Sequence, residues 1–323
     1  MDRARLIEVS RMYHEQNLTQ AQIARRLGIS RPTVSRMLTE ARDLGLARVI
    51  IADEQSVDTA SLENEVLQRY PVRSVHVVTG ASAGPDFVLR RTAQASARIV
   101  SEHITDGDRI GLAWGRTIFE VVCALPARAL QGVQLVQVMG NIDDASVPSY
   151  AMETLTTAAS LLNAEEALAL PCPILVATPA IRASLTSDPR VKEVLARARE
   201  CTTILLNLAL SDESSCLYRS GYIRPQDLEM LRNRGSVGSI AGHFVDPAGS
   251  IVSPELDNRT ISVPLHDIRR ARTVISCVAD QRKAGVLHAA LMAGLIDVLT
   301  MDSDTARALL LSDWEAVSIP APS

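Results

Sequence analysis

Short apolar runs alternate with helical patterns along most of this chain, and this alternation constrains the fold more than any other feature. The runs are Ser74–Thr79, Arg109–Trp114, Val133–Met139, Ile174–Thr178, Thr203–Leu210, Thr273–Ala279 and Asp297–Thr300. Strands that alternate with helices pair mostly in parallel, because each helix carries the chain back to the start of the next strand. The pattern therefore predicts an α/β domain, with ligands bound where the carboxyl ends of the strands meet the loops that follow.

The first 50 residues have a different pattern, with three short amphipathic helices. Leu6, Val9 and Tyr13 share one face of the first helix. Thr19 can cap a second helix, which Gly28 can end because glycine adopts positive φ at low cost. This arrangement predicts a supporting helix followed by the first half of a helix-turn-helix.

The third helix of this segment begins after Ser30, which can act as its N-cap. Pro32 falls in the first turn, where its missing N–H costs nothing, and Val34 and Leu38 continue the apolar face. The β-type run Leu46–Ile51 that follows predicts a small wing. We therefore expect an all-α, winged helix-turn-helix.

The sequence divides into three parts on this interpretation. Residues 1–52 form the helix-turn-helix domain, residues 53–71 a connecting helix, and residues 72–323 the larger α/β domain. An apolar face of Leu62, Val66 and Leu67 lies on the connecting helix. That face would either help subunits associate or cover the core of the large domain.

Charge separates the small domain from the rest of the chain. Residues 1–50 hold nine Arg and five Asp or Glu, so they carry +4, whereas the whole chain carries −4. Only the N-terminal part therefore suits a polyanion. The side chains predicted to contact operator DNA at its phosphates and base edges are Gln20, Ser30, Arg31, Thr33, Ser35 and Arg36. The alternative is an ordinary helical hairpin whose arginines are only solvated.

Several other classes of protein find no support in the sequence. The five cysteines form no CxxC pair, and the six histidines show no ligand spacing with Cys or acidic neighbours, so we expect no metal and no cofactor. There is no GxSxG motif and no Walker A loop. The N-terminus lacks an apolar signal region, and no apolar window of about 18 residues could span a bilayer. These features predict a cytoplasmic protein that does not contact a membrane.

One segment of the N-terminal part reads LTQAQIARRLGISRPTVSRMLTEARDLGL, and further landmarks occur at Gly111–Thr117, Arg219–Tyr222, Ser236–Ile240, Asp257–Arg259, and Lys283 with Ala289–Asp302. In these segments, and over essentially the whole chain, the sequence resembles the SorC family of sugar-responsive bacterial transcription regulators. The resemblance implies a DNA-binding domain at residues 1–52 and a domain for effector binding and oligomerisation at residues 72–323. It also implies a Rossmann-like fold for the large domain, similar to sugar-phosphate isomerases and deaminases, a sugar, polyol or sugar-phosphate effector, and a homodimer or homotetramer.

Gly115, Arg116 and Thr117 are the first candidates for the effector site. They follow a predicted strand and open a helix, and so offer backbone N–H groups, a hydroxyl and a guanidinium to an anion. A plain strand-to-helix turn would look the same. The resemblance implies that this turn binds the phosphate and that Lys283 adds charge. Lys283 is one of only two lysines in the chain, and its alternative role is that of a solvated surface residue.

Three further candidates have a local explanation as well. Asp257 and Arg259 could bind a sugar hydroxyl or could pair locally, and Asn141 could present its amide to hydroxyls or cap a loop. Two positions depart from the family pattern. Asn207 stands where a glycine-rich strand end is usual, and Ser239 replaces an acidic residue. We therefore expect altered ligand specificity, or a substitute carboxylate from Asp257 or Asp246.

Two rival functions remain open on the sequence alone. An isomerase would need a carboxylate base, for which Asp143 and Asp144 are candidates, although they also fit a polar loop. A regulator whose large domain only assembles subunits would bind no small molecule. The preferred hypothesis is a non-enzymatic regulator whose operator affinity responds to a carbohydrate effector.

Overall fold

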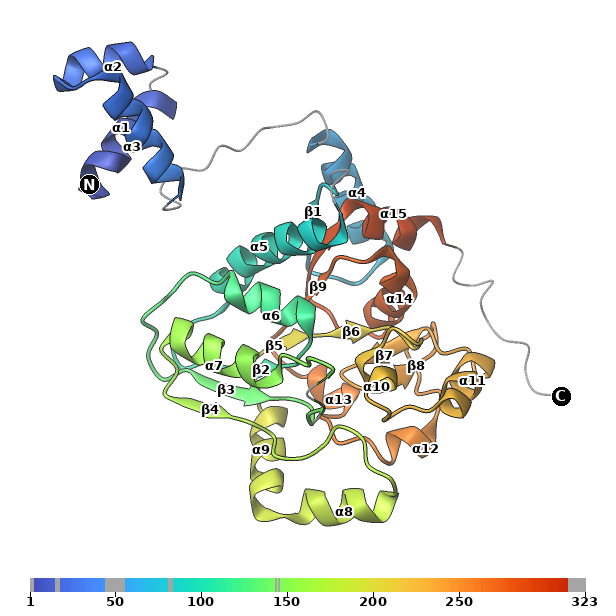
Figure 1. Cartoon of the computed structure of the whole chain (residues 1–323). Helices are drawn as coiled ribbons and strands as arrows, with labels where there is room; N and C mark the ends of the chain where they lie inside the picture. Colours follow the sequence, from blue (N-terminus) through green and yellow to red (C-terminus); the bar gives the residue numbers. More distant parts are fainter. Residues whose placement is uncertain are drawn as a thin grey trace. The chain divides into compact units, whose positions relative to one another are not determined.

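The computed structural model describes residues 3–14, 18–43, 56–80, 84–142, 144 and 146–312. The chain divides into two units, Met1–Glu54 and Gln55–Ser323, and both appear in Figure 1. No helix among the described residues is long and apolar enough to cross a membrane.

The smaller unit contains the helices α1 (Arg3–His14), α2 (Gln20–Leu27) and α3 (Arg31–Asp43). Thr19 caps α2 as predicted: its Oγ1 accepts from the Gln22 backbone N–H at 3.3 Å, and Gln22 Oε1 accepts from the Thr19 N–H at 2.8 Å. Gly28 ends α2 at φ 64°, and its N–H donates to the Ala24 carbonyl. The predicted helix ends of α2 are therefore confirmed.

One apolar cluster holds these three helices together. Its buried members come from all of them: Leu6, Val9, Met12, Ile23, Ala24, Val34, Met37 and Leu38. Tyr13, predicted on the same face as Leu6, is 38% exposed and lies at the margin. The helix-turn-helix is therefore observed, whereas the predicted wing at residues 46–51 lies outside the described residues.

Within the described part of the larger unit, seven strands form one parallel sheet in the order β1-β10-β9-β5-β2-β3-β4. Their bounds are β1 (Ser74–Val78), β2 (Arg109–Leu112), β3 (Gln134–Gln137), β4 (Glu166–Leu168), β5 (Thr203–Leu206), β9 (Thr273–Val278) and β10 (Val298–Asp302). The predicted parallel α/β domain is confirmed.

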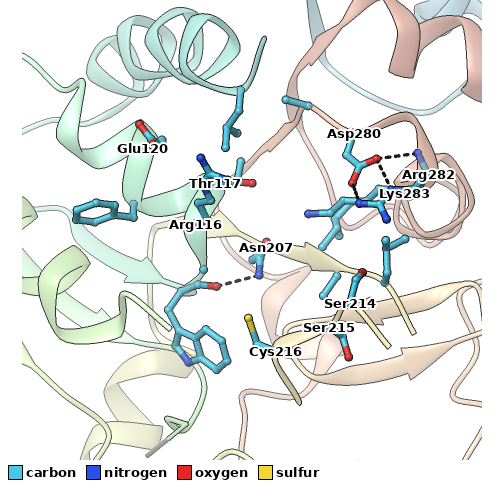
Figure 2. A pocket seen from close by; sticks show the side chains of 18 of the residues that line it. Arg116, Thr117, Glu120, Asn207, Ser214, Ser215, Cys216, Asp280, Arg282 and Lys283 are labelled. Carbon is cyan, nitrogen blue, oxygen red and sulfur yellow. Dashed lines mark hydrogen bonds and ion pairs between the residues drawn. The ribbon is translucent and has the colours of Figure 1, made fainter. Parts of the chain in front are cut away.

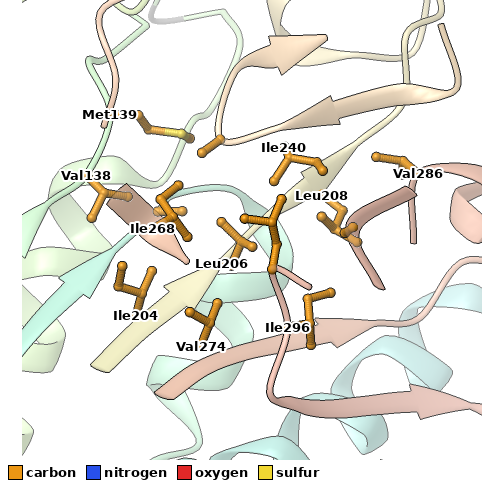
Figure 3. Packing of buried hydrophobic residues seen from close by; sticks show 14 of the residues in the cluster. Val138, Met139, Ile204, Leu206, Leu208, Ile240, Ile268, Val274, Val286 and Ile296 are labelled. Carbon is orange, nitrogen blue, oxygen red and sulfur yellow. The ribbon is translucent and has the colours of Figure 1, made fainter. Parts of the chain in front are cut away.

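Helices cover both faces of this sheet (Figure 1). On one face lie α5 (Pro85–His103), α6 (Arg116–Cys123) and α7 (Ala151–Leu162). The other face is covered by α4 (Ser56–Arg69), α9 (Pro189–Arg199), α14 (Ala284–Met292) and α15 (Ser303–Leu311). Successive strand residues point to opposite faces, so Ile204 and Leu206 enter one core and Leu205 the other. Figure 3 shows the first of these two cores.

The predicted connecting helix is α4, and it packs within the larger unit. Leu62 and Val66 are buried in the core, and Leu67 is 38% exposed. The Glu63 carboxylate accepts the Val77 backbone N–H at 2.7 Å, which ties α4 to β1. Of the two roles considered for this apolar face, Leu62 and Val66 therefore cover the core.

The prediction of a strand at Ile174–Thr178 is wrong. This segment is a loop that forms only isolated bridges, such as Leu175 with Thr260, and the edge strand of the sheet is β4 instead. The loop is apolar because it is buried: its Ile174 carbonyl accepts from the Ile261 N–H at 2.7 Å. A buried loop and a buried strand leave the same pattern in a sequence.

The predicted run Thr203–Leu210 divides at Asn207. Up to Leu206 it is β5 of the large sheet, and beyond Asn207 it joins a small antiparallel sheet. That sheet consists of β6 (Leu208–Ala209), β7 (Gly238–Ile240) and β8 (His243–Val245). Asn207 thus lies where the chain passes from one sheet to the other.

The remaining helices of the larger unit are short or peripheral. They are α8 (Pro179–Ser187), α10 (Cys216–Arg219), α11 (Pro225–Asn233), α12 (Pro254–Asp257), α13 (Leu265–Ile268) and the 3₁₀ helix η1 (Gln281–Lys283). Among these, α10 and η1 contribute residues to a pocket in the larger unit.

Candidate functional site

The predicted DNA-contacting residues gather at the start of α2 and along α3. Arg31, Ser35 and Arg36 are exposed on α3, and Gln20 is half-buried at the start of α2. Ser30 has a structural role as well, because its Oγ accepts from the Thr33 N–H at 3.3 Å and lies 2.8 Å from Thr33 Oγ1. Their contact with DNA stays a prediction.

A pocket of about 960 Å³ opens in the larger unit at the carboxyl ends of the parallel strands. Its lining comes mainly from the segments that follow β2, β3, β5, β9 and β10, with further residues from the start of α5 and from β7 (Gly238–Ile240). From β2 the chain proceeds outward to β3 and β4, then returns to β5 on the other side of β2. This reversal is a topological switch point, where open parallel sheets bind their ligands.

Gly115 and Asn207 meet at this switch point. Asn207 Nδ2 donates to the Trp114 carbonyl at 2.8 Å, and Trp114 Nε1 donates to the Gly140 carbonyl at 2.8 Å. Gly115 has φ 129° and ψ 163°, and a β-carbon there would lie 2.9 Å from Asn207 Nδ2. The position therefore requires glycine for its backbone conformation and for the close approach of Asn207.

The helix α6 begins at this point, and no side chain in the described part of the protein caps its N-terminal N–H groups. Uncapped N–H groups and the helix dipole attract anions. Thr117 lines the pocket in the first turn, as predicted. Arg116 also lines it, but its guanidinium forms an ion pair with Asp86 of α5 at 2.8 Å, with both side chains largely exposed.

Lys283 lines the pocket across from α6 (Figure 2). Burial lowers the pKa of its ammonium group, and the nearby carboxylate of Asp280 opposes that effect. Asp280 itself is held by Arg282, whose Nη2 lies 2.7 Å from Asp280 Oδ2. Burial raises the pKa of Asp280, but the hydrogen bonds from Arg282 outweigh it and leave this pKa below the usual value. Among the described residues, Lys283 has no such partner for its ammonium group.

Several lining residues were not among the predicted site residues. Phe119 and Tyr150 stack with ring centroids 4.8 Å apart, and Tyr150 has the left-handed backbone conformation, with φ 60°. Ser214 and Ser215 lie at the start of α10. Only the position of Asn207 at a strand end could have indicated its place in the pocket from the sequence.

Three predicted effector residues lie outside the pocket lining, and each is held by another contact. Asn141 Nδ2 donates to the Leu170 carbonyl at 2.8 Å. The carboxylate of Asp257 lies 2.6 Å from Nδ1 of the buried His243. The guanidinium of Arg259 reaches the Glu255 and Val176 carbonyls.

The proposed substitute carboxylates are also placed elsewhere. Asp257 is occupied by His243, and the carboxylate of Asp246 accepts the Ser250 N–H at 2.8 Å within a turn. Neither lines the pocket, whereas Ser239 does. The substitution at position 239 is therefore not offset by these two residues.

Comparison with known proteins identifies the family. Residues 54–311 match the family model described as "Putative sugar-binding domain", and residues 10–55 match the MarR family model. The full-length sorbitol operon regulator SorC from Klebsiella pneumoniae superimposes with a TM-score of 0.81 at 27% identity, covering 96% of this chain and 99% of that one. This chain belongs to the SorC family of transcription regulators.

Relatives in the SorC family extend over almost the full length of the chain. The deoxyribonucleoside regulator of Bacillus subtilis is 29% identical over 306 residues, which are 94% of this chain and 96% of the relative. The sorbitol operon regulator of Klebsiella pneumoniae is 28% identical over 312 residues, 94% of this chain and 97% of the relative. The chain is therefore a transcription regulator with a sugar-binding domain.

Proposed function

We propose that this SorC-family regulator binds a small phosphorylated sugar or polyol in the pocket and thereby changes its affinity for operator DNA. The observation that carries the proposal is the meeting of the α6 N-terminus, Thr117 and the half-buried Lys283 at one pocket. Backbone N–H groups, a hydroxyl and an ammonium are all donors to phosphate oxygens. The volume is within the range of small-molecule sites.

The rest of the lining supports a polyhydroxylated ligand. Ser214 and Ser215 offer hydroxyls, and the Phe119–Tyr150 stack offers an apolar wall for the carbon skeleton. Two relatives carry names that refer to a deoxyribonucleoside and to sorbitol. Because the hydroxyl of Ser239 is a weaker hydrogen-bond acceptor than a carboxylate, we expect the ligand specificity to differ from that of family members with an acidic residue at this position.

A thermal-shift titration tests the ligand. Sorbitol, sorbitol 6-phosphate and 2-deoxyribose 5-phosphate are compared on the full chain, its Lys283→Met variant and the matched control Lys192→Met, whose lysine lies on α9. A phosphate ester at 100 times its Kd raises the free energy of unfolding by about 2.7 kcal/mol. We expect stabilisation by a phosphate ester that Lys283→Met removes and Lys192→Met keeps. Absence of stabilisation by all three compounds would count against a sugar effector.

For the DNA end, we propose that Gln20, Ser30, Arg31, Thr33, Ser35 and Arg36 contact the operator. A single base-reading arginine is worth about 1–3 kcal/mol of discrimination. In gel shifts with operator fragments, Arg36→Ala and Arg31→Ala should therefore weaken binding by about five-fold to 150-fold, whereas Arg234→Ala in the larger unit should not. Unchanged affinity and unchanged salt dependence in the α3 variants would refute the assignment.

We further propose that the regulator is cytoplasmic and acts as a dimer or tetramer, since paired half-sites on DNA require paired reading helices. An enzymatic role receives no support from the candidate base that the structure describes. Asp144 accepts two hydrogen bonds from Ser146, which lower the pKa of its carboxyl group and make it a weaker base. Asp143 lies outside the described residues.

A further inference from the structure

The helix α4 is the first described element after residues 3–43, and side chains fasten it to two other helices. Arg307 of α15 forms an ion pair with Asp58 in the first turn of α4. At the other end, Arg69 of α4 donates to the Leu310 carbonyl at 2.6 Å. Tyr70 Oη lies 2.9 Å from Nδ1 of His288, which belongs to α14.

Both partner helices begin in the pocket wall. The first residue of α14 follows directly after Lys283, and α15 starts between Asp302 and Asp304. All three of these residues line the pocket. Asp302 caps the N-terminus of α15: its carboxylate accepts hydrogen bonds from the backbone N–H groups of Asp304 and Thr305, at 2.9 and 3.0 Å.

Arg307 connects these two ends of the structure. Its Nη1 lies 3.0 Å from Oδ1 of the pocket residue Asp304, and its Nη2 contacts Asp58 of α4. One guanidinium is therefore shared between the carboxylate of a residue that lines the pocket and a carboxylate on the helix that follows the DNA-binding unit in sequence. A ligand group that forms a hydrogen bond with Asp304 therefore changes the strength of the ion pair between Arg307 and Asp58.

We propose that Arg307 is the regulatory link between pocket and α4: a ligand hydroxyl that donates to Asp304 loosens the Asp304–Arg307 pair and shifts how firmly the start of α4 is held. This inference rests on the proposed function, because it requires a hydroxylated ligand in the pocket. The His288–Tyr70 bond holds the other end of α4 in place meanwhile. The coupling is reciprocal, so whatever changes α4 also changes ligand affinity.

The solvent exposure of the side chains that form these ion pairs sets the expected size of the ligand's effect on α4. The side chains of Arg307, Asp304 and Asp58 are 44%, 59% and 52% exposed, and ion pairs in such positions change equilibria by at most about five-fold. Control of this size is modest for one subunit. It multiplies when several subunits contribute to one DNA complex.

Hydrogen exchange on the full chain tests the proposal. Amide exchange is followed at residues 56–63 of α4 and at residues 115–119 of the pocket, with sorbitol 6-phosphate and 2-deoxyribose 5-phosphate each as probe. The variants are Arg307→Gln and the matched control Arg234→Gln, whose arginine is 40% exposed and pairs with Glu255 at 2.8 Å. Operator affinity is measured for the same samples.

We expect a probe to protect residues 115–119 in all three proteins and to change exchange at 56–63 by up to about five-fold in the unmodified protein and in Arg234→Gln. In Arg307→Gln that second change should disappear, together with most of the probe's effect on operator affinity. Pocket protection without any change in α4, or an undiminished α4 response in Arg307→Gln, overturns the inference and leaves the proposed function intact. If neither probe protects residues 115–119, the proposed function fails and the inference fails with it.

Discussion

Replacement of Gly115 by alanine is the sharpest test of how the pocket is built. The φ of 129° and ψ of 163° place this residue in a region essentially restricted to glycine, where another residue costs about 1–3 kcal/mol. The new β-carbon would lie 2.9 Å from Asn207 Nδ2, so the amide must rotate away. That movement breaks its 2.8 Å bond to the Trp114 carbonyl, at about 1 kcal/mol. Together, Gly115→Ala should lower the free energy of unfolding by about 2–4 kcal/mol.

Gly221→Ala is a matched control. Gly221 also has positive φ, at 73°, but no atom of the described residues lies within 4 Å of the place a β-carbon would take, so this variant reports the backbone cost alone, about 1–2 kcal/mol. Urea denaturation of both variants, followed by far-ultraviolet circular dichroism, gives the two losses. Gly115→Ala should lose more than Gly221→Ala, because its backbone region is more restricted and because it also loses the contact with Asn207.

A double-mutant cycle isolates the same contact. Asn207→Ala alone should cost about 1 kcal/mol for the lost hydrogen bond, but almost nothing in the Gly115→Ala background, where that bond is already broken. Equal losses for Gly115→Ala and Gly221→Ala, with additive effects of Gly115→Ala and Asn207→Ala, would refute the close approach at the switch point.

Three further predictions concern single side chains. Thr19→Ala removes the capping box of α2 and should lower the free energy of unfolding of the small unit by about 1 kcal/mol, measured by urea denaturation. Thr39→Ala, which loses only a bond to the Ser35 carbonyl within α3, should have a smaller effect. Burial lowers the pKa of Lys283 in the folded state, so the folded protein binds this proton less readily than the unfolded chain does, and the charged lysine costs stability at pH 7. Lys283→Met removes that cost, so the Tm of the variant should exceed that of the unmodified protein at pH 7. The gain should vanish above pH 10.5, where the lysine is neutral in both states. Burial raises the pKa of the Asp108 carboxyl, but hydrogen bonds from Arg272, Thr105 and Thr202 outweigh it and leave this pKa below 3.8. The ionised carboxylate therefore stabilises the folded protein fully above pH 3.8, and this stabilisation is lost as the pH falls through the folded pKa. Asp108→Asn should destabilise the protein at pH 7 and flatten the acid limb of a Tm-against-pH curve.

The parts of the fold that depend on neighbouring residues could be predicted from the sequence. Thr19 and Gly28 fix the ends of α2 through bonds that span three or four residues. Alternation of strands with helices predicted the parallel sheet, since period and length are local properties. The Ile174 loop was misassigned because burial against residues 259–261 makes its side chains as apolar as those of a strand.

Pocket-lining residues could be predicted from the sequence only where they lie shortly after the end of a strand. Gly115, Thr117 and Lys283 follow strand ends directly, and all three line the pocket. For Asn141 and Asp257, a partner distant in sequence decides where the side chain points: the Leu170 carbonyl is 29 residues from Asn141. Local pattern contains no information about such partners.

Asn207 makes a structural hydrogen bond and also lines the pocket. The Asn207 side chain fits at this strand end because Gly115, at the start of α6 after the neighbouring strand β2, has no β-carbon. The amide then joins the ends of β5 and β2 through the Trp114 carbonyl, and Trp114 in turn joins β2 to the Gly140 carbonyl after β3. Two hydrogen bonds thus connect three adjacent strand ends in the pocket wall. Because the amide that makes the first bond also lines the pocket, a ligand of altered shape would be selected by the same residue that holds the wall together, and Asn207→Gly should change specificity and stability in one step.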